Sequence, residues 1–302
     1  MNNQIRAAIV AIAVIIPLSG FAVWSSDNSG FAETADTSKI VALTSFYPLY
    51  EFTSQVGQSN VDISLLVPAG VEPHDWEPTI HDIERMQQAD LVIINGIGFE
   101  NWIDNIDEIN SRALIVDTSK GVDIISSKDD EHSLGDPHIW LNPVMAKIQV
   151  QNIANSLIKV DPENKNLYQE NANSYISKLD ALDATIKDEL KECKTDFIAF
   201  HKAFSYFAIQ YGLNQHTIVK TNDPLAEPTS KTLEEIIKQA KQFETDVIFT
   251  EEGVDTRTSQ VIANELDGQV LVLSPLEVNE DDSNYFAKME QNLSNLKEAL
   301  CK

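Results

Sequence analysis

The 302-residue chain is long enough for two domain-sized cores, and its hydrophobic content of 43% is typical of a globular protein. Its formal net charge of -25 leaves no basic surface that could neutralise phosphates, so the composition argues against nucleic acid as a partner. An acidic surface attracts cations, although an excess of Asp and Glu also serves simply to keep an exported protein soluble.

The N-terminus has the features of an export signal. Arg6 precedes an apolar run from Ala7 to Val23, and no Cys follows that could carry a lipid anchor. The run is close to the roughly 17-residue minimum for a membrane-spanning helix, so an uncleaved anchor is the alternative. Small and polar residues from Ser25 to Ser38 are typical of a flexible tether.

Short apolar runs rich in β-branched residues predict buried strands in both halves of the chain. They are Ile40–Thr44, Val61–Val67, Leu91–Ile94, Ala113–Val116, Phe197–Phe200, His216–Val219, Val247–Phe249 and Val270–Leu273. Segments with helical spacing separate them, and the helix after the second run is expected to begin at Thr79 with Asp82 as its capping partner. This alternation predicts an α/β fold with mainly parallel sheets.

A longer helix is predicted in the middle of the chain. From Glu163 to about Cys193, apolar residues recur at helical spacing, which indicates about 30 residues and a length of roughly 45 Å. Such a helix can span two lobes or pack on one, and the periodicity leaves both open. Glu77-Pro78-Thr79 and Glu227-Pro228-Thr229 each open a predicted helix, a short internal repeat that mildly favours two related lobes.

The chain has two cysteines, Cys193 and Cys301. Export would place them in an oxidising compartment, where two cysteines are expected to form a disulfide. The sequence does not show whether their Cα atoms come within bridging distance. A cysteine-ligated metal site is less well supported, because neither cysteine belongs to a C-x-x-C motif or has a neighbouring His.

Three of the six histidines lie in segments that are unlike ordinary surface positions. His74 and His138 lie in proline-containing loops, and His201 follows the predicted strand Phe197–Phe200, where α/β sheets place ligand-binding groups. Three neutral imidazoles on separate loops suit Zn²⁺, whose bonds to nitrogen are roughly 2.0–2.1 Å long. Each histidine taken singly is also explained by a structural role, so the residues alone leave the metal site and the structural interpretation open.

A metal bound by three imidazoles needs a fourth ligand, a carboxylate or water. Glu277 follows the last predicted strand and is the preferred candidate, while Glu251 and Glu252 follow the strand before it. Structural roles are expected for the other histidines, His81, His132 and His216. For His132, which lies in an acidic run, a weak auxiliary metal site is the alternative.

At these residues the sequence resembles the ZnuA-like (cluster A-I) family, the zinc- and manganese-binding solute receptors of ABC importers. The matching segments are Ser45–Tyr50, Val67–Thr79, Ala89–Gly96, Asp136–Pro143, His201–Phe204, Asn222–Pro228 and Leu273–Glu277. The resemblance implies two α/β lobes that are joined by one long rigid helix and hold a metal in the cleft between them. The implied divisions are a signal or anchor and tether (1–38), an N-terminal metal-binding lobe (39–162), a linking helix (163–193) and a C-terminal metal-binding lobe (194–302).

The resemblance also implies the metal ligands. His74 and His138 match the ligands of the first lobe, His201 matches the third ligand, and Glu277 matches a carboxylate found in some zinc-binding members. Related manganese receptors have a carboxylate in place of His201, and a third imidazole favours Zn²⁺ over Mn²⁺. One departure from the family is that the segment from Ser126 to Asp136 contains one His, where many zinc receptors have a His-rich run.

The function implied by this resemblance is not enzymatic. A monomer outside the cytoplasm, held at the membrane by an anchor or through its permease, would capture Zn²⁺ and deliver it to an ABC permease and its ATPase. The residues leave one alternative, a zinc hydrolase or lyase with three histidine ligands, a water in the fourth position and Glu277 as general base. A third possibility is an adhesive surface receptor in which the metal is structural.

Overall fold

The computed structural model describes residues 39–103, 112–126, 134–220, 224–278 and 283–301. The predicted signal or anchor and tether, residues 1–38, lies outside the described residues. Among the helices of the described part, none is both long and apolar enough to cross a membrane.

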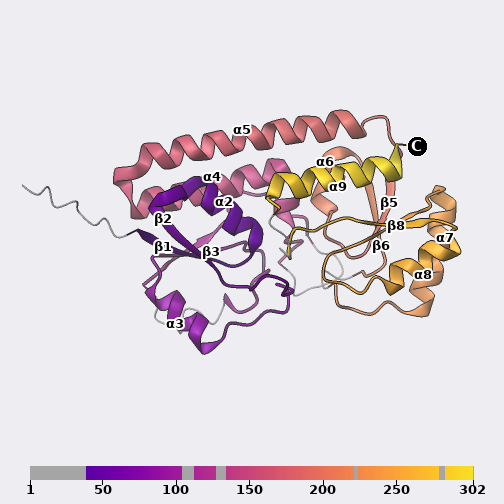
Figure 1. Cartoon of the computed structure of the whole chain (residues 1–302), viewed down its shortest axis with the longest axis horizontal. Helices are drawn as coiled ribbons and strands as arrows, with labels where there is room; N and C mark the ends of the chain where they lie inside the picture. Colours follow the sequence, from indigo (N-terminus) through magenta and orange to yellow (C-terminus); the bar gives the residue numbers. More distant parts are fainter. Residues whose placement is uncertain (1–38, 104–111, 127–133, 221–223, 279–282, 302) are drawn as a thin grey trace, which may run out of the picture. The chain divides into compact units, whose positions relative to one another are not determined.

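The first lobe contains a four-stranded parallel sheet with the strand order β2-β1-β3-β4 (Figure 1). Strand β1 pairs with β2 on one side and with β3 on the other, so that Ala42 lies opposite Ile63 of β2 and Leu91 of β3. Its strands are β1 (Ile40–Thr44), β2 (Val61–Leu65), β3 (Leu91–Ile94) and β4 (Leu114–Asp117), and its helices are α2 (Tyr47–Gly57), α3 (Ile80–Gln88) and α4 (Pro143–Val160).

The second lobe repeats this topology with the strand order β6-β5-β7-β8, again entirely parallel. Its strands are β5 (Asp196–Ala199), β6 (Asn214–Thr217), β7 (Val247–Thr250) and β8 (Gln269–Val272), and its helices are α6 (Ser205–Tyr211), α7 (Ser230–Phe243), α8 (Arg257–Glu265) and α9 (Tyr285–Leu300). In each sheet the first strand lies between the second and the third. The predicted α/β class with mainly parallel sheets is confirmed.

Several strands differ by one or two residues at an end from the sequence prediction, and β6 shows the physical reason most clearly. The predicted strand His216–Val219 begins two residues earlier, because β6 pairs with β5 from Asn214 opposite Asp196. The apolar Ile218 and Val219 instead follow the strand and are buried in the core of the second lobe. An edge strand with polar residues is difficult to recognise by hydrophobicity, since only part of its surface is covered.

The long helix α5 (Lys165–Leu190) has 26 residues, because Pro162–Asn164 forms a separate 3-10 turn before it. It packs on α2 and α4 from the first lobe and on α6 and α9 from the second. Tyr168, Tyr175 and Ile186 lie on its buried face and belong to a core that contains residues of both sheets. The helix therefore spans the two lobes, one of the two possibilities that its periodicity allows.

Threonine caps fix the start of one helix in each lobe. Thr79 accepts a hydrogen bond from the backbone N–H of Asp82, and the Asp82 carboxylate accepts from the backbone N–H of Thr79, which confirms the predicted capping pair. In the second lobe Thr229 accepts from the backbone N–H of Thr232 at the start of α7. Each cap thus sets the residue at which its helix begins.

A disulfide joins Cys193, just after α5, to Cys301, just after α9. The bond closes a sequence separation of 108 residues that contains all four strands of the second lobe. Closing a long loop restricts the unfolded chain, which raises the free energy of unfolding.

Replacing both cysteines by alanine is expected to lower the free energy of unfolding by about 2–5 kcal/mol, because the unfolded chain regains its freedom. Thermal or denaturant unfolding measures the change. Adding a reductant should destabilise the wild-type protein but leave the double variant unchanged. Equal stabilities of the oxidised wild type and the variant would contradict the expectation.

Candidate metal centre

Each of the four predicted ligands lies in a loop beyond the carboxyl end of a strand. His74 follows β2 and His138 follows β4 in the first lobe, while His201 follows β5 and Glu277 follows β8 in the second. Because all strands within a sheet are parallel, these loops emerge at the same edge of their sheet, where α/β proteins bind ligands. Gly135, three residues before His138, has φ of 138°, and a Cβ there would lie 2.3 Å from Ile124 Cγ2, so this turn before His138 requires glycine.

The structure brings the four predicted side chains together in one cluster. Four ligand atoms, one from each of His74, His138, His201 and Glu277, lie within 4.8 Å of one another. Glu277 Oε1 lies 3.4 Å from His74 Nε2, 3.2 Å from His138 Nε2 and 4.0 Å from His201 Nε2. His138 Nε2 and His201 Nε2 are 3.3 Å apart. The cluster thus places three imidazole nitrogens and one carboxylate oxygen within reach of a single cation.

Two further carboxylates set the orientation of the buried histidines. Asp136 Oδ1 lies 2.8 Å from His138 Nδ1, and Glu251 Oε2 lies 2.5 Å from His201 Nδ1. The same carboxylates accept hydrogen bonds from the backbone N–H groups of His138 and His201, at 3.1 and 3.0 Å. A carboxylate that accepts from Nδ1–H leaves the Nε2 lone pair free for a cation and fixes the plane of the ring.

The nitrogen and oxygen atoms that face one another in this cluster are all hydrogen-bond acceptors when each ring carries its proton on Nδ1. With Nδ1 protonated, the facing Nε2 atoms of His138 and His201 are both acceptors, and the nearby oxygen of Glu277 is an acceptor too. His74 Nε2 and Glu277 Oε1 are buried and make no hydrogen bond of acceptable geometry within the described part of the chain. Buried lone pairs that face one another are unfavourable unless a proton or a metal ion lies between them. Three nitrogens and one oxygen form a ligand set that suits tetrahedral Zn²⁺.

Without a metal, a proton takes this role. Burial by itself would lower the pKa of His138, but the carboxylates of Asp136 and Glu277 outweigh it and raise the pKa to about 10. Burial would raise the pKa of Glu277, yet His74, His138 and His201 hold it well below the ordinary value. The raised pKa of His138 and the lowered pKa of Glu277 both favour a protonated His138 beside an ionised Glu277 when no metal is bound.

The other candidate ligands lie outside this cluster. Glu251 orients His201, and Glu252 accepts hydrogen bonds from Lys288 Nζ at 2.9 Å and from Ser274 Oγ at 2.6 Å. Both carboxylates thus have other partners, whereas Glu277 Oε1 points at the three imidazoles.

The remaining histidines are not part of the cluster. His81 is on the surface of α3, with its side chain 80% exposed and 3.9 Å from the Glu84 carboxylate. His216 Nε2 lies 2.9 Å from Asp196 Oδ1, and its ring stacks on Phe243. His132, with its suggested auxiliary metal site, lies outside the described residues.

The orienting roles of Asp136 and Glu251 were not predicted from the sequence. Asp136 had a local signal, since it is two residues before His138 and turns back onto it. Glu251 is 50 residues from His201, and only the pairing of β5 with β7 makes them neighbours. Strand order in the sheet was therefore needed to find the second orienting carboxylate.

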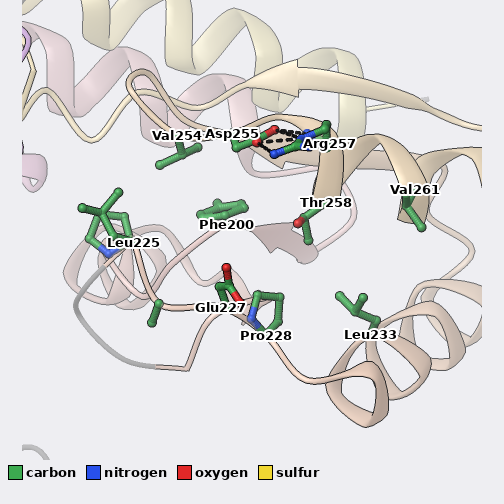
Figure 2. Close-up of a pocket in the computed structure, with 12 residues that line it drawn as sticks. Phe200, Leu225, Glu227, Pro228, Leu233, Val254, Asp255, Arg257, Thr258 and Val261 are labelled. Carbon is green, nitrogen blue, oxygen red and sulfur yellow. Dashed lines mark hydrogen bonds and ion pairs between the residues drawn. The ribbon is translucent and has the colours of Figure 1, made fainter.

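A separate groove of about 450 Å³ lies in the second lobe, beside the segments that precede α7 and α8 (Figure 2). Phe200, Leu225 and Val261 contribute to its apolar lining, and its charged lining residues are Glu227 and the paired Asp255 and Arg257. None of the four clustered ligands lines it. The groove is therefore distinct from the candidate metal centre, to which both lobes contribute.

A two-lobed α/β protein that gathers three histidines and a carboxylate from both lobes has the architecture of a metal-binding solute receptor. The sequence profile of the family described as ZnuA, zinc-uptake complex component A, periplasmic, matches residues 42–299. The chain belongs to this family.

Individual relatives agree with this assignment. The high-affinity zinc uptake system protein ZnuA of Bacillus subtilis is 37% identical over 294 residues, covering 90% of this chain and 92% of the relative. Zinc-binding protein AdcA of Streptococcus pyogenes is 33% identical over 86% of this chain, which spans only 56% of that longer protein. The crystal structure of the Zn(II)-bound ZnuA-like domain of Streptococcus pneumoniae AdcA is 31% identical, covers 87% of this chain and 99% of that one, and has a TM-score of 0.77.

Zinc binding near pH 7.5 is expected to release about one proton per ion. The metal-free His138, with its pKa raised to about 10, must lose its proton before Nε2 can bind the metal, so affinity should rise with pH below that value. Calorimetry in buffers of different ionisation enthalpy measures the proton count. Asp136→Asn removes a charge that raises the pKa of His138 and should reduce the count; binding enthalpies that do not depend on the buffer in the wild type would contradict the expectation.

Proposed function

We propose that this protein captures Zn²⁺ with His74, His138, His201 and Glu277 and delivers it to an ABC-type importer consisting of a permease and its ATPase. The observation that carries the proposal is the buried convergence of three imidazole Nε2 atoms on the Glu277 carboxylate. Membership in the zinc-uptake component A family supports the transport role and the partnership with an uptake complex.

The ligand set supports Zn²⁺ over Mn²⁺. Three borderline-soft nitrogens and one oxygen suit zinc, whereas Mn²⁺ prefers a larger share of oxygen ligands. The relatives named for zinc uptake and zinc binding, and the solved structure with Zn(II) bound, support the same choice.

We also propose that the protein has no enzymatic activity. Four protein ligands would fill a tetrahedral coordination sphere, so no position remains for an activated water. In the alternative hydrolase, Glu277 would have to act as general base rather than ligand, but its oxygen already faces all three imidazoles. The family, a component of a metal-uptake complex, favours the transport interpretation.

The organisation of the chain completes the proposal. Residues 39–162 and 194–302 would each form a metal-binding lobe, with residues 163–193 as the link between them. Residues 1–38 would export the protein and then be cleaved, or remain as an anchor and tether. The protein would act as a monomer outside the cytoplasm, in accord with the periplasmic family description.

Zinc should raise the melting temperature of the protein strongly, because binding to the folded state alone adds about 4 kcal/mol at a free concentration of 1,000 times Kd. His201→Ala should abolish this increase in melting temperature. Vesicles that contain the importer should also take up no zinc when they are supplied with this variant. His216→Ala, which removes a histidine from the same lobe but outside the cluster, is the matched control and should retain both. If zinc raised the melting temperature of His201→Ala as much as that of the wild type, the assigned ligand set would be wrong.

The choice between receptor and hydrolase is tested by substituting Co²⁺ for zinc. A site closed by four protein ligands should give a visible absorption spectrum that does not change as the pH rises through neutrality. A spectrum that titrates would reveal a bound water and favour the hydrolase. Elemental analysis of protein purified without added metal identifies the ion that it carries.

A further inference from the structure

The turn that leads to Glu277 is held by side chains from both lobes. Asn292, on α9, forms two hydrogen bonds with the backbone of Ser274: its Oδ1 accepts from the Ser274 N–H at 2.8 Å, and its Nδ2 donates to the Ser274 carbonyl at 2.7 Å. From the first lobe, Trp140 Nε1 donates to the carbonyl of Pro275 at 2.7 Å. These bonds fix the backbone two and three residues before the candidate ligand.

Within this turn, Leu276 has a left-handed backbone conformation. Its φ is 61°, although it is not a glycine, and the residue is fully buried. This conformation is unfavourable for leucine, so the surrounding contacts must hold it. One of these contacts is Ser274 Oγ, which accepts a hydrogen bond from the Leu276 N–H at 3.2 Å. Because Leu276 directly precedes Glu277, its conformation sets the direction in which the Glu277 side chain leaves the backbone.

A largely buried ion pair orients the hydroxyl of Ser274. Ser274 Oγ donates to Glu252 Oε2 at 2.6 Å, and Glu252 Oε1 accepts from Lys288 Nζ at 2.9 Å. The side chain of Lys288, on α9, is 4% exposed, and that of Glu252 is 23% exposed. Since the hydroxyl hydrogen of Ser274 is directed at Glu252, a lone pair of Oγ is left to accept from the N–H of Leu276.

Stability alone gives little reason for this ion pair. Taking two charges out of water costs about as much free energy as their attraction returns, and apolar residues of the same volume are often equally stable. The pair of Lys288 and Glu252 is joined, through one hydroxyl, to the turn that precedes a candidate metal ligand. A role in the metal site therefore explains its position better than a contribution to folding.

We infer that Lys288, Glu252 and Ser274 are positioning residues for Glu277, and that the carboxylate they fix makes the site selective for Zn²⁺ over a larger cation. The inference rests on the proposed zinc-binding function and adds residues that determine its specificity. Selectivity between cations depends on the size of the cavity and on the number and flexibility of the ligands. A carboxylate on a fixed turn cannot move back to accommodate the longer bonds of a larger ion, and Cd²⁺ is a suitable probe because it accepts the same nitrogen and oxygen ligands.

Ser274→Ala tests the positioning role, because it removes the hydroxyl and leaves the Leu276 N–H without this acceptor. The zinc affinity, measured by competition with chelators, should fall about 10-fold to 100-fold, the usual effect of removing an outer-sphere partner. The cadmium affinity should fall less, so the ratio of zinc affinity to cadmium affinity should decrease. Lys288→Met, which removes the partner of Glu252, should change the ratio in the same direction.

Lys297→Met is the matched control. Lys297 is also on α9, and its Nζ lies 2.7 Å from Glu189 Oε2 on α5, but this pair has no hydrogen bond to the turn before Glu277 within the described residues. The control should keep both the zinc affinity and the ratio of the wild type. Thermal unfolding of the metal-free proteins verifies that each variant is folded.

A double-variant cycle separates positioning from general support of the fold. Adding Ser274→Ala to Glu277→Ala should change the zinc affinity little, because the side chain that Ser274 positions is already absent. A purely structural role would instead weaken binding equally in both backgrounds. If Ser274→Ala does not fold, Lys288→Met takes its place in the cycle.

Two results would overturn the inference. One is a wild-type ratio of zinc affinity to cadmium affinity in both Ser274→Ala and Lys288→Met. The other is an equal loss of zinc affinity when Ser274→Ala is added to the wild type and to Glu277→Ala. A wild-type protein that binds no zinc would overturn the proposed function as well, and this outcome is distinguishable because it does not depend on any variant.

Discussion

Three imidazole nitrogens and one carboxylate oxygen point at the same buried space, and the surrounding structure makes this arrangement possible. Like lone pairs repel one another in a low-dielectric interior unless a cation lies between them. Asp136 and Glu251 hold His138 and His201 with Nε2 facing inward, so the rings cannot turn away to relieve the repulsion. The folded chain therefore favours a positive charge at this position, and a zinc ion supplies it in the proposed metal-bound state.

The two parallel sheets explain how such distant residues meet. In each sheet the carboxyl ends of the strands lie at one edge, and each lobe supplies two candidate ligands from loops that follow those ends. The core that contains α5 includes residues of both sheets, which gives the loops a common support. Trp140 and Tyr285 then connect the His138 loop to the second lobe by buried hydrogen bonds. The geometry of the site thus depends on contacts made by residues near the candidate ligands in the chain, as well as on the candidate ligands themselves.

The sequence alone determined the α/β class, because strands rich in β-branched residues and amphipathic helices differ in local periodicity. It also indicated His74, His138, His201 and Glu277 as candidates, since His74 and His138 lie in proline-containing loops and His201 and Glu277 follow predicted strands, and the family resemblance made them a set. Hydrophobicity misplaced β6 because the strand is polar and at an edge. Only the tertiary structure separated Glu277 from Glu251 and Glu252, and only it showed that Trp140 joins two ligand loops, because strand order and contacts between lobes depend on residues that are far apart in the chain.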